Sequence, residues 1–421
     1  MLCCMFKKLC FVFLIAAFVM GSYSATENRA VSKAERIDEL VARYAKYGYL
    51  NGTVLVAEHG KSIYEKGIGE ANMESHVPNT PRTKFGIASL TKQFTAVLVL
   101  QQAAEGRIRL EGKVSDYLPW YRNDTGEHMT IEQMLHHTAG LPPDFDMPEF
   151  SDSEAASRHY EPQVFAEKFC QPNLSSEPGT KWEYSNCVYD LLGLILERVT
   201  GKSFGDLLRE RLLEPLGMKD TGMDRNDLVE LGCASGYMRH AGPRYAAGPY
   251  EDRGHIFAAG AMYSTAEDLF RWSQALSEGG SVPKEIRDQI FKPGMGNWGY
   301  GWFVTKIGPG EPGAGSTMEE MRGDMLGNYF SWILRYPEQD GVIIVLRNVY
   351  GSTERLEQNI QAILYDMEPR MPSRSPKDLA ARLWQVPGAW AESHRALGVV
   401  VVSFAVVVIW QAARRRRKTG A

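Results

Sequence analysis

A serine and a lysine, three residues apart, open a long segment that has almost no polar face. Ser89-Leu90-Thr91-Lys92 leads into residues 93–104, which are apolar on nearly every face until Gly106 interrupts the pattern. This pattern predicts a helix that is surrounded by protein on all sides and ends at the glycine. The chain must therefore build its core around this helix, whose first turn carries a hydroxyl and an amine.

The spacing of Ser89 and Lys92 favours serine acyl-transfer chemistry. Residues three apart on a helix lie on the same face, so the lysine amine can reach the serine hydroxyl. The hydroxyl is a poor nucleophile without a nearby base, and partial burial lowers the pKa of an amine so that it accepts a proton. The alternative is that Ser89 only caps the helix. Ser281 and Lys284 have the same spacing, but two glycines and a proline around them indicate a capped helix start.

A second candidate motif, Tyr184-Ser185-Asn186, lies between a turn-like segment and an apolar helix-forming segment. Beside a lysine ammonium a phenol is easier to ionise, so we expect Tyr184 to carry the proton of Ser89 to a leaving group. Asn186 is expected to hydrogen-bond the substrate amide. Tyr121-Arg122-Asn123 has the same pattern but lies in a polar, turn-rich stretch, which predicts a surface loop.

Together these motifs resemble those of the serine β-lactamase and penicillin-binding-protein family, especially its class C β-lactamase, DD-peptidase and esterase branch. Further segments carry the resemblance in the same order, from about residue 33 to 366: 106–110, 117–119, 129–131, 135–142, 258–269 and 299–302. The resemblance implies that Ser89 is the nucleophile, that Lys92 and Tyr184 transfer protons and that Asn186 orients the substrate. It also implies a structural hydrogen-bonding role for His137.

The family's third motif, Lys-Thr-Gly or His-x-Gly on a strand beside the nucleophile, has changed in this chain. Residues 318–330 occupy its place, and two registers are possible. In one register Met321 takes the cationic position and the site lacks its cation, whereas in the other Arg322 takes it and Asp324 stands at the glycine. Because side chains alternate along a strand, only one of Met321 and Arg322 faces the site. We favour Arg322, whose guanidinium would pair with a substrate carboxylate.

The oxyanion hole should consist of two backbone N–H groups, one from Ser89 and one near Asp324. Backbone donors do not depend on side chains. We therefore expect the altered motif to affect substrate specificity more than the acyl-transfer reaction. Three other segments fit the residue pattern of the third motif. We discount them because they precede the final pair of strands: Lys292-Pro293-Gly294, Lys306-Ile307-Gly308 and His240-Ala241-Gly242.

Alternating segments near both ends of the domain predict two β-hairpins. The predicted strands are residues 51–58 and 61–67, which turn at His59-Gly60, and residues 329–336 and 342–346. The predicted helices are residues 32–47 and 353–367, with a mostly helical segment from about 90 to 280. The fold class is therefore α/β in the α+β sense: an antiparallel sheet flanked by helices, with an inserted, mostly helical subdomain. The resemblance implies this β-lactamase/transpeptidase-like fold for residues 30–370, with the active site between sheet and subdomain.

Apolar segments near both ends of the chain predict export and attachment to a membrane. Residues 1–25 follow the plan of a secretory signal peptide, with an uncleaved anchor as the alternative. Residues 396–413 form a nearly uncharged, valine-rich run that predicts one transmembrane helix. The basic tail, 414–421, should stay in the cytoplasm. The domain and its polar stalk, 371–395, should then lie on the periplasmic or extracellular side.

Charge and cysteine content narrow the possible partners. The formal net charge is −4, and the basic clusters near both ends make the domain between them more acidic still, which argues against nucleic-acid binding. No His and Cys spacing resembles a zinc site, and no glycine-rich phosphate loop follows a strand, so we expect neither metal nor cofactor.

Outside the signal segment the cysteines are Cys170, Cys187 and Cys233. An odd number argues against a disulfide framework, with a Cys170–Cys187 pair as the alternative.

The sequence thus predicts an exported, membrane-anchored serine hydrolase that forms an acyl-enzyme through Ser89. D-Ala-D-Ala-type peptides, D-amino acyl amides, small esters and β-lactams all undergo this chemistry in the family that the chain resembles. The expected partners are a small-molecule or peptide substrate and the membrane, and the oligomeric state stays open. The altered third motif supports a competing hypothesis, a catalytically weakened protein that binds or senses a ligand.

Overall fold

The computed structural model describes residues 31–144, 158–224, 232–239, 245–248, 252–325, 328–350 and 354–372. The predicted signal peptide, membrane helix and basic tail lie outside these residues, as does nearly all of the stalk. Among the residues described, no helix is long and apolar enough to cross a membrane. The structure therefore bears on the domain predicted over residues 30–370.

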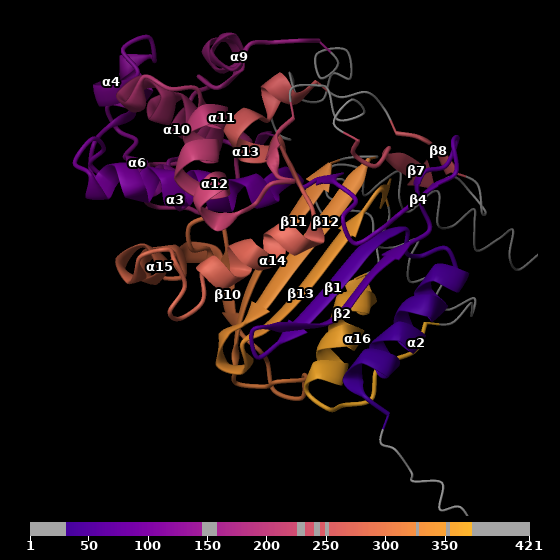
Figure 1. Ribbon diagram of the computed structural model, residues 1–421. Coiled ribbons are helices and arrows are strands. Elements are labelled where there is room, and N and C mark those ends of the chain that lie inside the picture. The colour runs from indigo at the N-terminus through magenta and orange to yellow at the C-terminus, as the bar shows by residue number, and fades with distance from the viewer. Residues whose placement is uncertain are drawn as a thin grey trace, which may run out of the picture.

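A six-stranded antiparallel sheet forms the middle of the domain (Figure 1). Its strand order is β10 (Phe303–Lys306), β11 (Thr317–Met325), β12 (Tyr329–Tyr336), β13 (Gly341–Arg347), β1 (Gly52–Glu58) and β2 (Lys61–Ile68). Both predicted hairpins, β1–β2 and β12–β13, are present. The first turns at His59 and Gly60, whose φ angles of 52° and 69° suit the tight turn of a right-twisted hairpin. Pairing of β1 with β13 joins the two ends of the domain.

Both faces of the sheet are covered, and successive residues of β1 alternate between two apolar cores. Val54 and Val56 belong to the core beneath α2 (Lys33–Lys46) and α16 (Glu354–Leu364), whereas Leu55 and Ala57 belong to the larger core of the helical part. This period of two is what a strand with two buried faces requires. The helices α2 and α16 lie side by side on one face (Figure 1), as the sequence predicted.

The helical part of the domain packs on the other face of the sheet. Its helices are α3 (Thr91–Ala104), α4 (Val114–Tyr117), α5 (Asn123–Gly126), α6 (Ile131–Leu135), α9 (Pro162–Phe169), α10 (Asn186–Thr200), α11 (Phe204–Leu208), α12 (Glu214–Leu216), α13 (Phe257–Gly260), α14 (Ala266–Ala275) and α15 (Lys284–Ile290). The short strands are β3 (Glu70–Asn72), β4 (Val77–Pro78), β5 (Phe85–Gly86), β6 (Gly222–Met223), β7 (Tyr237–Arg239), β8 (Tyr245–Ala247), β9 (Met262–Ser264) and β14 (Val349–Tyr350).

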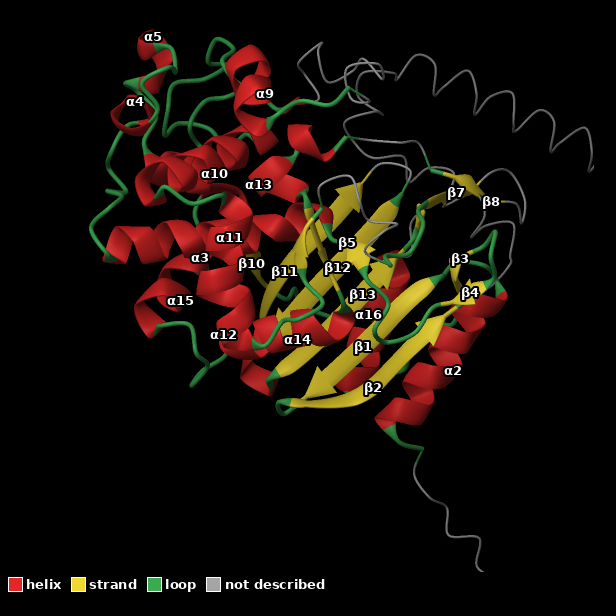
Figure 2. Cartoon of the chain, turned by 45° about the horizontal axis from the view of Figure 1, so that its top comes forward, coloured by secondary structure: helices red, strands yellow, loops and turns green. Residues whose placement is uncertain are grey.

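The helix α3 runs through the centre of this part and is buried on almost every side. It ends just before Gly106, whose φ of 73° is the left-handed conformation that terminates helices, as predicted. Figure 2 shows most of the helices gathered beside the β10–β11 edge of the sheet. The mixed α/β architecture with an antiparallel sheet agrees with the sequence prediction.

Candidate active site

Ser89 lies in a single turn of 3₁₀-helix, Ala88–Leu90, between β5 and the buried helix α3. It is the only residue of the segment Phe85–Leu100 that is not fully buried. Ala88 has a φ of 47°, a strained conformation for a residue with a side chain, and such strain is concentrated at functional sites. Ile87 is held by β12, because Ser331 donates its hydroxyl to the Ile87 carbonyl at 2.8 Å. The backbone thus presents one polar side chain from an otherwise buried segment.

Lys92 is completely buried one helical turn after Ser89. Its Nζ lies 3.2 Å from Ser89 Oγ and donates hydrogen bonds to Asn186 Oδ1 at 2.6 Å and to the Ala259 carbonyl at 2.9 Å. Burial lowers the pKa of this amine to about 7, while the nearby carboxylates of Asp190 and Asp144 oppose the shift. The lowered pKa agrees with the sequence prediction, and an amine in this state accepts a proton near neutral pH.

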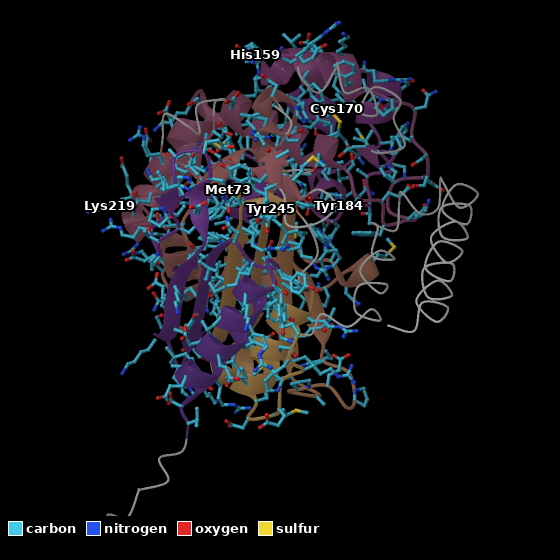
Figure 3. All side chains as sticks on the ribbon, turned by 90° about the vertical axis from the view of Figure 1, so that its right-hand side faces the viewer. Met73, His159, Cys170, Tyr184, Lys219 and Tyr245 are labelled. Atoms are coloured by element: carbon cyan, nitrogen blue, oxygen red, sulfur yellow. A yellow bond between two sulfur atoms is a disulfide. The ribbon has the colours of Figure 1, made fainter. Side chains whose placement is uncertain are left out.

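Tyr184 donates a hydrogen bond from its phenol to Ser89 Oγ at 2.8 Å, and its ring centre lies 4.8 Å from Lys92 Nζ. The residue lies where the helical part meets the sheet (Figure 3). Burial raises the pKa of the phenol, although the hydrogen bond with Ser89 opposes the shift. The prediction that this phenol is easier to ionise is therefore wrong, because loss of solvation outweighs the hydrogen bond with Ser89, and the charges of Asp144 and Asp190 raise the pKa further. Tyr184 is a neutral donor at physiological pH.

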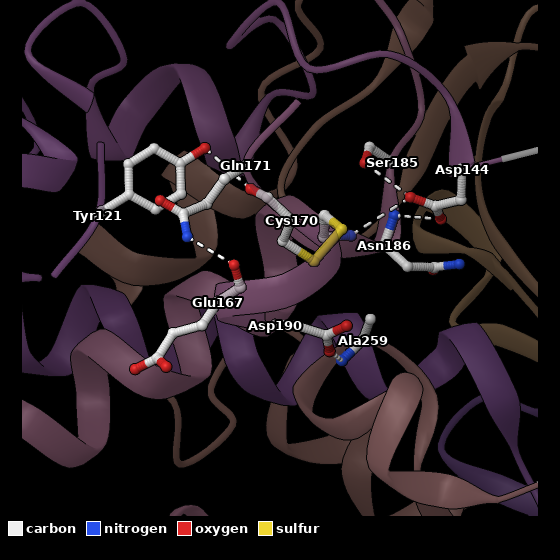
Figure 4. Close-up of a disulfide and its surroundings, with 10 residues drawn as sticks. Tyr121, Asp144, Glu167, Cys170, Gln171, Ser185, Asn186, Asp190 and Ala259 are labelled. Atoms are coloured by element: carbon white, nitrogen blue, oxygen red, sulfur yellow. Dashed lines mark hydrogen bonds between the residues drawn. A yellow bond between two sulfur atoms is a disulfide. The ribbon is translucent and has the colours of Figure 1, made fainter. Parts of the chain in front are cut away.

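Asp144 organises the turn that carries Tyr184 and Asn186, and the sequence analysis did not find it. It accepts hydrogen bonds from the Ser185 hydroxyl at 2.8 Å and from the Asn186 N–H at 2.6 Å (Figure 4). Asn186 is the first residue of α10, so its N–H has no partner within the helix, and the carboxylate supplies one. Asp144 and Asn186 are 42 positions apart, so no local pattern relates them and only the fold brings them together.

His137 is buried beneath this turn, in agreement with the structural role that the resemblance implied. Its Nδ1 accepts a hydrogen bond from the Ser185 N–H at 3.3 Å. Its ring centre lies 4.4 Å from that of Tyr184 and 4.7 Å from that of Trp298. Burial lowers the pKa of the imidazole well below its usual value, with the Lys92 charge acting in the same direction. His137 is therefore a neutral support for the Tyr184 ring.

The strand β11 decides between the two registers of the third motif. A Cβ added at Gly323 would lie 2.1 Å from the Ile87 carbonyl oxygen, so the glycine faces the segment that leads into Ser89 and is required there. Met321, two residues earlier, lies on the same face and is buried in the larger core. Arg322 points to the opposite face and is exposed, and its guanidinium carbon lies 4.3 Å from the centre of the Trp332 ring, which belongs to the core beneath α2 and α16.

The prediction that Arg322 faces the site is therefore wrong, and Met321 stands at the position of the family's cation. The physical reason is the period of two along the strand, which Gly323 anchors by its close approach to Ile87. The Asp324 side chain is exposed and shares the face of Arg322. The contribution of a backbone N–H near Asp324 to an oxyanion hole stays a prediction.

The two alternative motifs differ from the site in their surroundings. Ser281 is exposed and Lys284 pairs with Asp288, but the residue that caps α15 is Pro283 and not Ser281 as predicted. Tyr121 is buried, not at the surface as predicted, and donates its hydroxyl to the Cys170 carbonyl at 2.9 Å. Neither motif brings a serine, a lysine and a tyrosine together.

A disulfide joins Cys170 to Cys187, with 5.3 Å between the two Cα atoms (Figure 4). The bond ties the end of α9 to the second residue of α10, directly after Asn186. Cys233 takes no part in a disulfide between residues that the structure describes. The preference against a disulfide was wrong, because an odd number of cysteines does not prevent two of them from forming one. Within the described part of the chain, no group of three or more His, Cys, Asp or Glu side chains is placed to hold a metal ion.

Comparison with known sequences identifies the family. The model of the family described as Beta-lactamase matches residues 35–366. The chain belongs to the Beta-lactamase family. A relative, Protein flp of Staphylococcus aureus strain MW2, is 29% identical over 327 residues, which cover 75% of this chain. The match spans 63% of the length of that curated relative.

Solved structures of other proteins share the fold. An octameric penicillin-binding protein homologue from Pyrococcus abyssi superimposes with a TM-score of 0.66 and 24% identity, covering 79% of this chain and 78% of its own. The D-amino acid amidase from Ochrobactrum anthropi SV3, solved with L-phenylalanine amide, gives a TM-score of 0.62 and 24% identity, covering 79% and 95%. The chain is therefore a member of the Beta-lactamase family by sequence and shares the fold of these solved structures.

Proposed function

We propose that this member of the Beta-lactamase family is a serine hydrolase that forms an acyl-enzyme through Ser89. The observation that carries the proposal is the position of one hydroxyl, Ser89 Oγ, which lies 3.2 Å from a buried amine and 2.8 Å from a phenol. A serine that only caps a helix requires neither contact. The lowered pKa of Lys92 supports its role as the base, because burial favours the neutral amine.

In the proposed reaction Ser89 Oγ bonds to the carbonyl carbon of the substrate, and the hydroxyl proton goes to the neutral amine of Lys92. The bond from the carbonyl carbon to the leaving oxygen or nitrogen then breaks as that atom takes the phenolic proton of Tyr184, and the Lys92 ammonium returns a proton to the phenol. In the second half, water bonds to the acyl carbon and gives a proton to Lys92. The bond to Ser89 Oγ then breaks, Oγ takes that proton back, and the acid product leaves. Asn186, held by Lys92 and Asp144, is proposed to orient the substrate amide.

We further propose that the preferred substrates are esters or amides that carry no carboxylate beside the scissile bond. The support is the Met321 side chain at the cationic position of the family, with Arg322 on the far face of the sheet. A carboxylate desolvated against methionine would have no charged partner there, which is costly. Aromatic rings add apolar surface next to Tyr184. The Trp182 ring lies beside that of Tyr184, and its centre is 6.0 Å from the centre of the Phe303 ring. The D-amino acid amidase with the same fold was solved with L-phenylalanine amide, which has no carboxylate.

We propose that the domain works on the outer side of a membrane, tethered by the segment 396–413. The support is the apolar run followed by the cluster Arg414–Lys418, a pattern that retains its basic end in the cytoplasm. Protease added to intact cells or spheroplasts should release the domain by cutting the stalk near Pro372. A tag at the C-terminus that is reached from outside would reverse the orientation.

The test of the hydrolase is covalent labelling of the full-length protein in membranes. A fluorophosphonate probe should label the peptide that contains Ser89, and a fluorescent penicillin, which carries a carboxylate, should label the same peptide much more weakly. A neutral ester should be hydrolysed with a burst of acyl-enzyme. Absence of any label on Ser89 would reject the hydrolase and favour the alternative of a binding or sensing protein.

A further inference from the structure

Asp190 is a buried carboxylate for which the proposed reaction has no role. It lies on α10, four residues after Asn186, and only 2% of its surface is exposed. Its Oδ1 accepts a hydrogen bond from the Ala259 N–H at 2.9 Å, whereas its Oδ2 has no hydrogen-bond partner among the described residues. A buried carboxylate oxygen without a donor destabilises a fold, so packing alone does not explain this residue.

Ala259 connects Asp190 to Lys92. Its N–H donates to Asp190 Oδ1 and its carbonyl accepts from Lys92 Nζ, each at 2.9 Å. Figure 4 shows the first of these two bonds. A carboxylate and an amine thus bind the two polar backbone groups of one residue, and hydrogen bonds in such a chain polarise and strengthen each other.

The close packing of α10 on α13 makes this connection possible. Gly193 lies one turn after Asp190, and a Cβ there would be 2.4 Å from the Ala258 Cβ and 2.8 Å from the Phe257 ring. Glycine is unfavourable within a helix, so its place here is explained by the approach that it allows. On the other side of α13, Thr95 of α3 donates its hydroxyl to the Ala258 carbonyl at 2.7 Å. Both contacts hold Ala259 between the carboxylate and the amine.

Among the described residues, five titratable side chains face Lys92 from the elements packed around it: Asp190, Tyr184 and Tyr189 from α10 and its N-terminal turn, and Asp144 and His137 from the preceding loops. Burial raises the pKa of both phenols and lowers that of the imidazole, so all three are neutral at physiological pH. Burial also raises the pKa of both carboxylates, that of Asp190 well above its usual value, but the Lys92 charge opposes both shifts and so favours their charged forms. Of this set, only the two carboxylates can carry a counter-charge for the Lys92 ammonium. Asp144 already accepts the Ser185 hydroxyl and the Asn186 and Cys187 N–H groups, whereas Asp190 keeps one oxygen without a donor.

We propose that Asp190 is a positioning residue that acts through Ala259 as the counter-charge of Lys92 and keeps the amine basic enough to take the proton of Ser89. Desolvation alone would leave Lys92 a weak base, and a buried carboxylate restores part of its basicity. A general base works best when its pKa lies near the working pH. The proposal rests on the proposed function for the use of that proton, but the link between Asp190 and Lys92 belongs to the resting protein.

The test measures the protonation of Lys92 directly, by NMR of the full-length protein in detergent with ¹³C-labelled lysine. The Lys92 Cε signal is assigned by its loss in Lys92→Met. Its titration midpoint should lie near 7 in the wild type. In Asp190→Asn, which preserves the shape and the hydrogen bond to Ala259, the midpoint should fall by about one pH unit. An unchanged midpoint in a folded Asp190→Asn protein overturns the proposal.

The matched control is Asp268→Asn. Asp268, near the start of α14, is another buried aspartate. It accepts hydrogen bonds from the Asp220 N–H and the Thr221 hydroxyl. Its substitution should lower stability without moving the Lys92 midpoint. If Asp190→Asn does not fold, the wild type still decides, because the ¹³Cγ signal of Asp190 should shift as Lys92 titrates. A signal that stays constant through the Lys92 titration overturns the proposal.

Turnover of a neutral ester separates this inference from the proposed hydrolase. In Asp190→Asn the acidic limb of kcat/KM should move to lower pH by the same amount as the Lys92 midpoint. If the wild type shows no Ser89-dependent turnover but Asp190→Asn still moves the Lys92 midpoint, the hydrolase is rejected. The link between Asp190 and Lys92 is then retained. If turnover depends on Ser89 but Asp190→Asn changes neither the Lys92 midpoint nor the acidic limb of kcat/KM, the hydrolase is retained and the link between Asp190 and Lys92 is rejected.

Discussion

The two sides of the candidate site differ in how far they follow the family. On the helical side, Ser89, Lys92, Tyr184 and Asn186 are joined by hydrogen bonds between 2.6 and 3.2 Å. On the sheet side, β11 presents Met321 and sends its only arginine to the opposite face. One side retains the polar groups that acyl transfer requires, and the other lacks the cation that would hold an anionic substrate.

Under the proposed function, the two tasks of reacting with a substrate and selecting it belong to separable parts of the fold. The helical side is interlocked, because Lys92, Asn186 and Asp144 hold each other, so one substitution there disturbs several contacts. On β11 the requirement is mainly one of backbone, since Gly323 must approach Ile87 while the neighbouring side chain is free to differ. Specificity can therefore change on the strand without loss of the reacting groups.

The largest effect should come from Ser89→Ala, which removes the nucleophile from the helical side. We expect turnover of a neutral ester to fall by at least about a thousandfold, while the free energy of unfolding changes by no more than about 1–2 kcal/mol. Ser281→Ala, the matched serine of the other Ser-x-x-Lys, should behave like the wild type. Full turnover in Ser89→Ala would reject the assignment, and loss of turnover only in Ser281→Ala would mean that the wrong motif was chosen.

The disulfide tests whether the helical side depends on its covalent tie. Replacing both Cys170 and Cys187 by alanine should lower the free energy of unfolding by about 3 kcal/mol, because the bond closes a loop with a sequence separation of 17. Chemical denaturation measures the change. Cys233→Ala, at a cysteine outside this disulfide, should change stability much less. Equal losses for the two variants would show that the bond adds nothing to the fold.

The pH dependence tests whether Lys92 is the base. Because burial lowers its pKa to about 7, the amine should be neutral above that pH and charged below it, so kcat/KM should fall on the acidic side. Two pH units below the pKa, the expected loss is about a hundredfold. The unfolded chain binds this proton more tightly, so the same shift makes stability rise with pH from about 7 toward the usual value of 10.5. An acidic limb near the usual lysine pKa would contradict the assignment.

The smallest effects should separate Met321 from Arg322 on β11. Met321→Lys restores a cation to the site face and should raise kcat/KM for an ester with a free carboxylate by about tenfold relative to its neutral analogue. Arg322→Ala removes a guanidinium from the far face and should change turnover of either ester less than about twofold. A selective loss of the carboxylate substrate in Arg322→Ala would restore the register that the structure rejects.

Much of the fold could be predicted because its signals are local. The alternating strands and the turn at His59-Gly60 specify a hairpin within 20 residues, and the apolar run after Lys92 specifies a buried helix ended by Gly106. The pair Ser89 and Lys92 lies within one helical turn, so its geometry follows from spacing alone. Tyr184 could be placed near Ser89 only through the resemblance, since 95 positions separate the two residues.

The sequence by itself determined which groups can react, because a hydroxyl one turn from a buried amine is a local property of the chain. Only the tertiary structure decided which face of β11 meets the site, because a strand offers two registers until the approach of Gly323 to Ile87 selects one. It also decided the ionisation of Tyr184 and the contacts of Asp144 and Asp190. These depend on burial and on partners distant in the chain, and no local pattern records how much water a side chain loses when the chain folds around it.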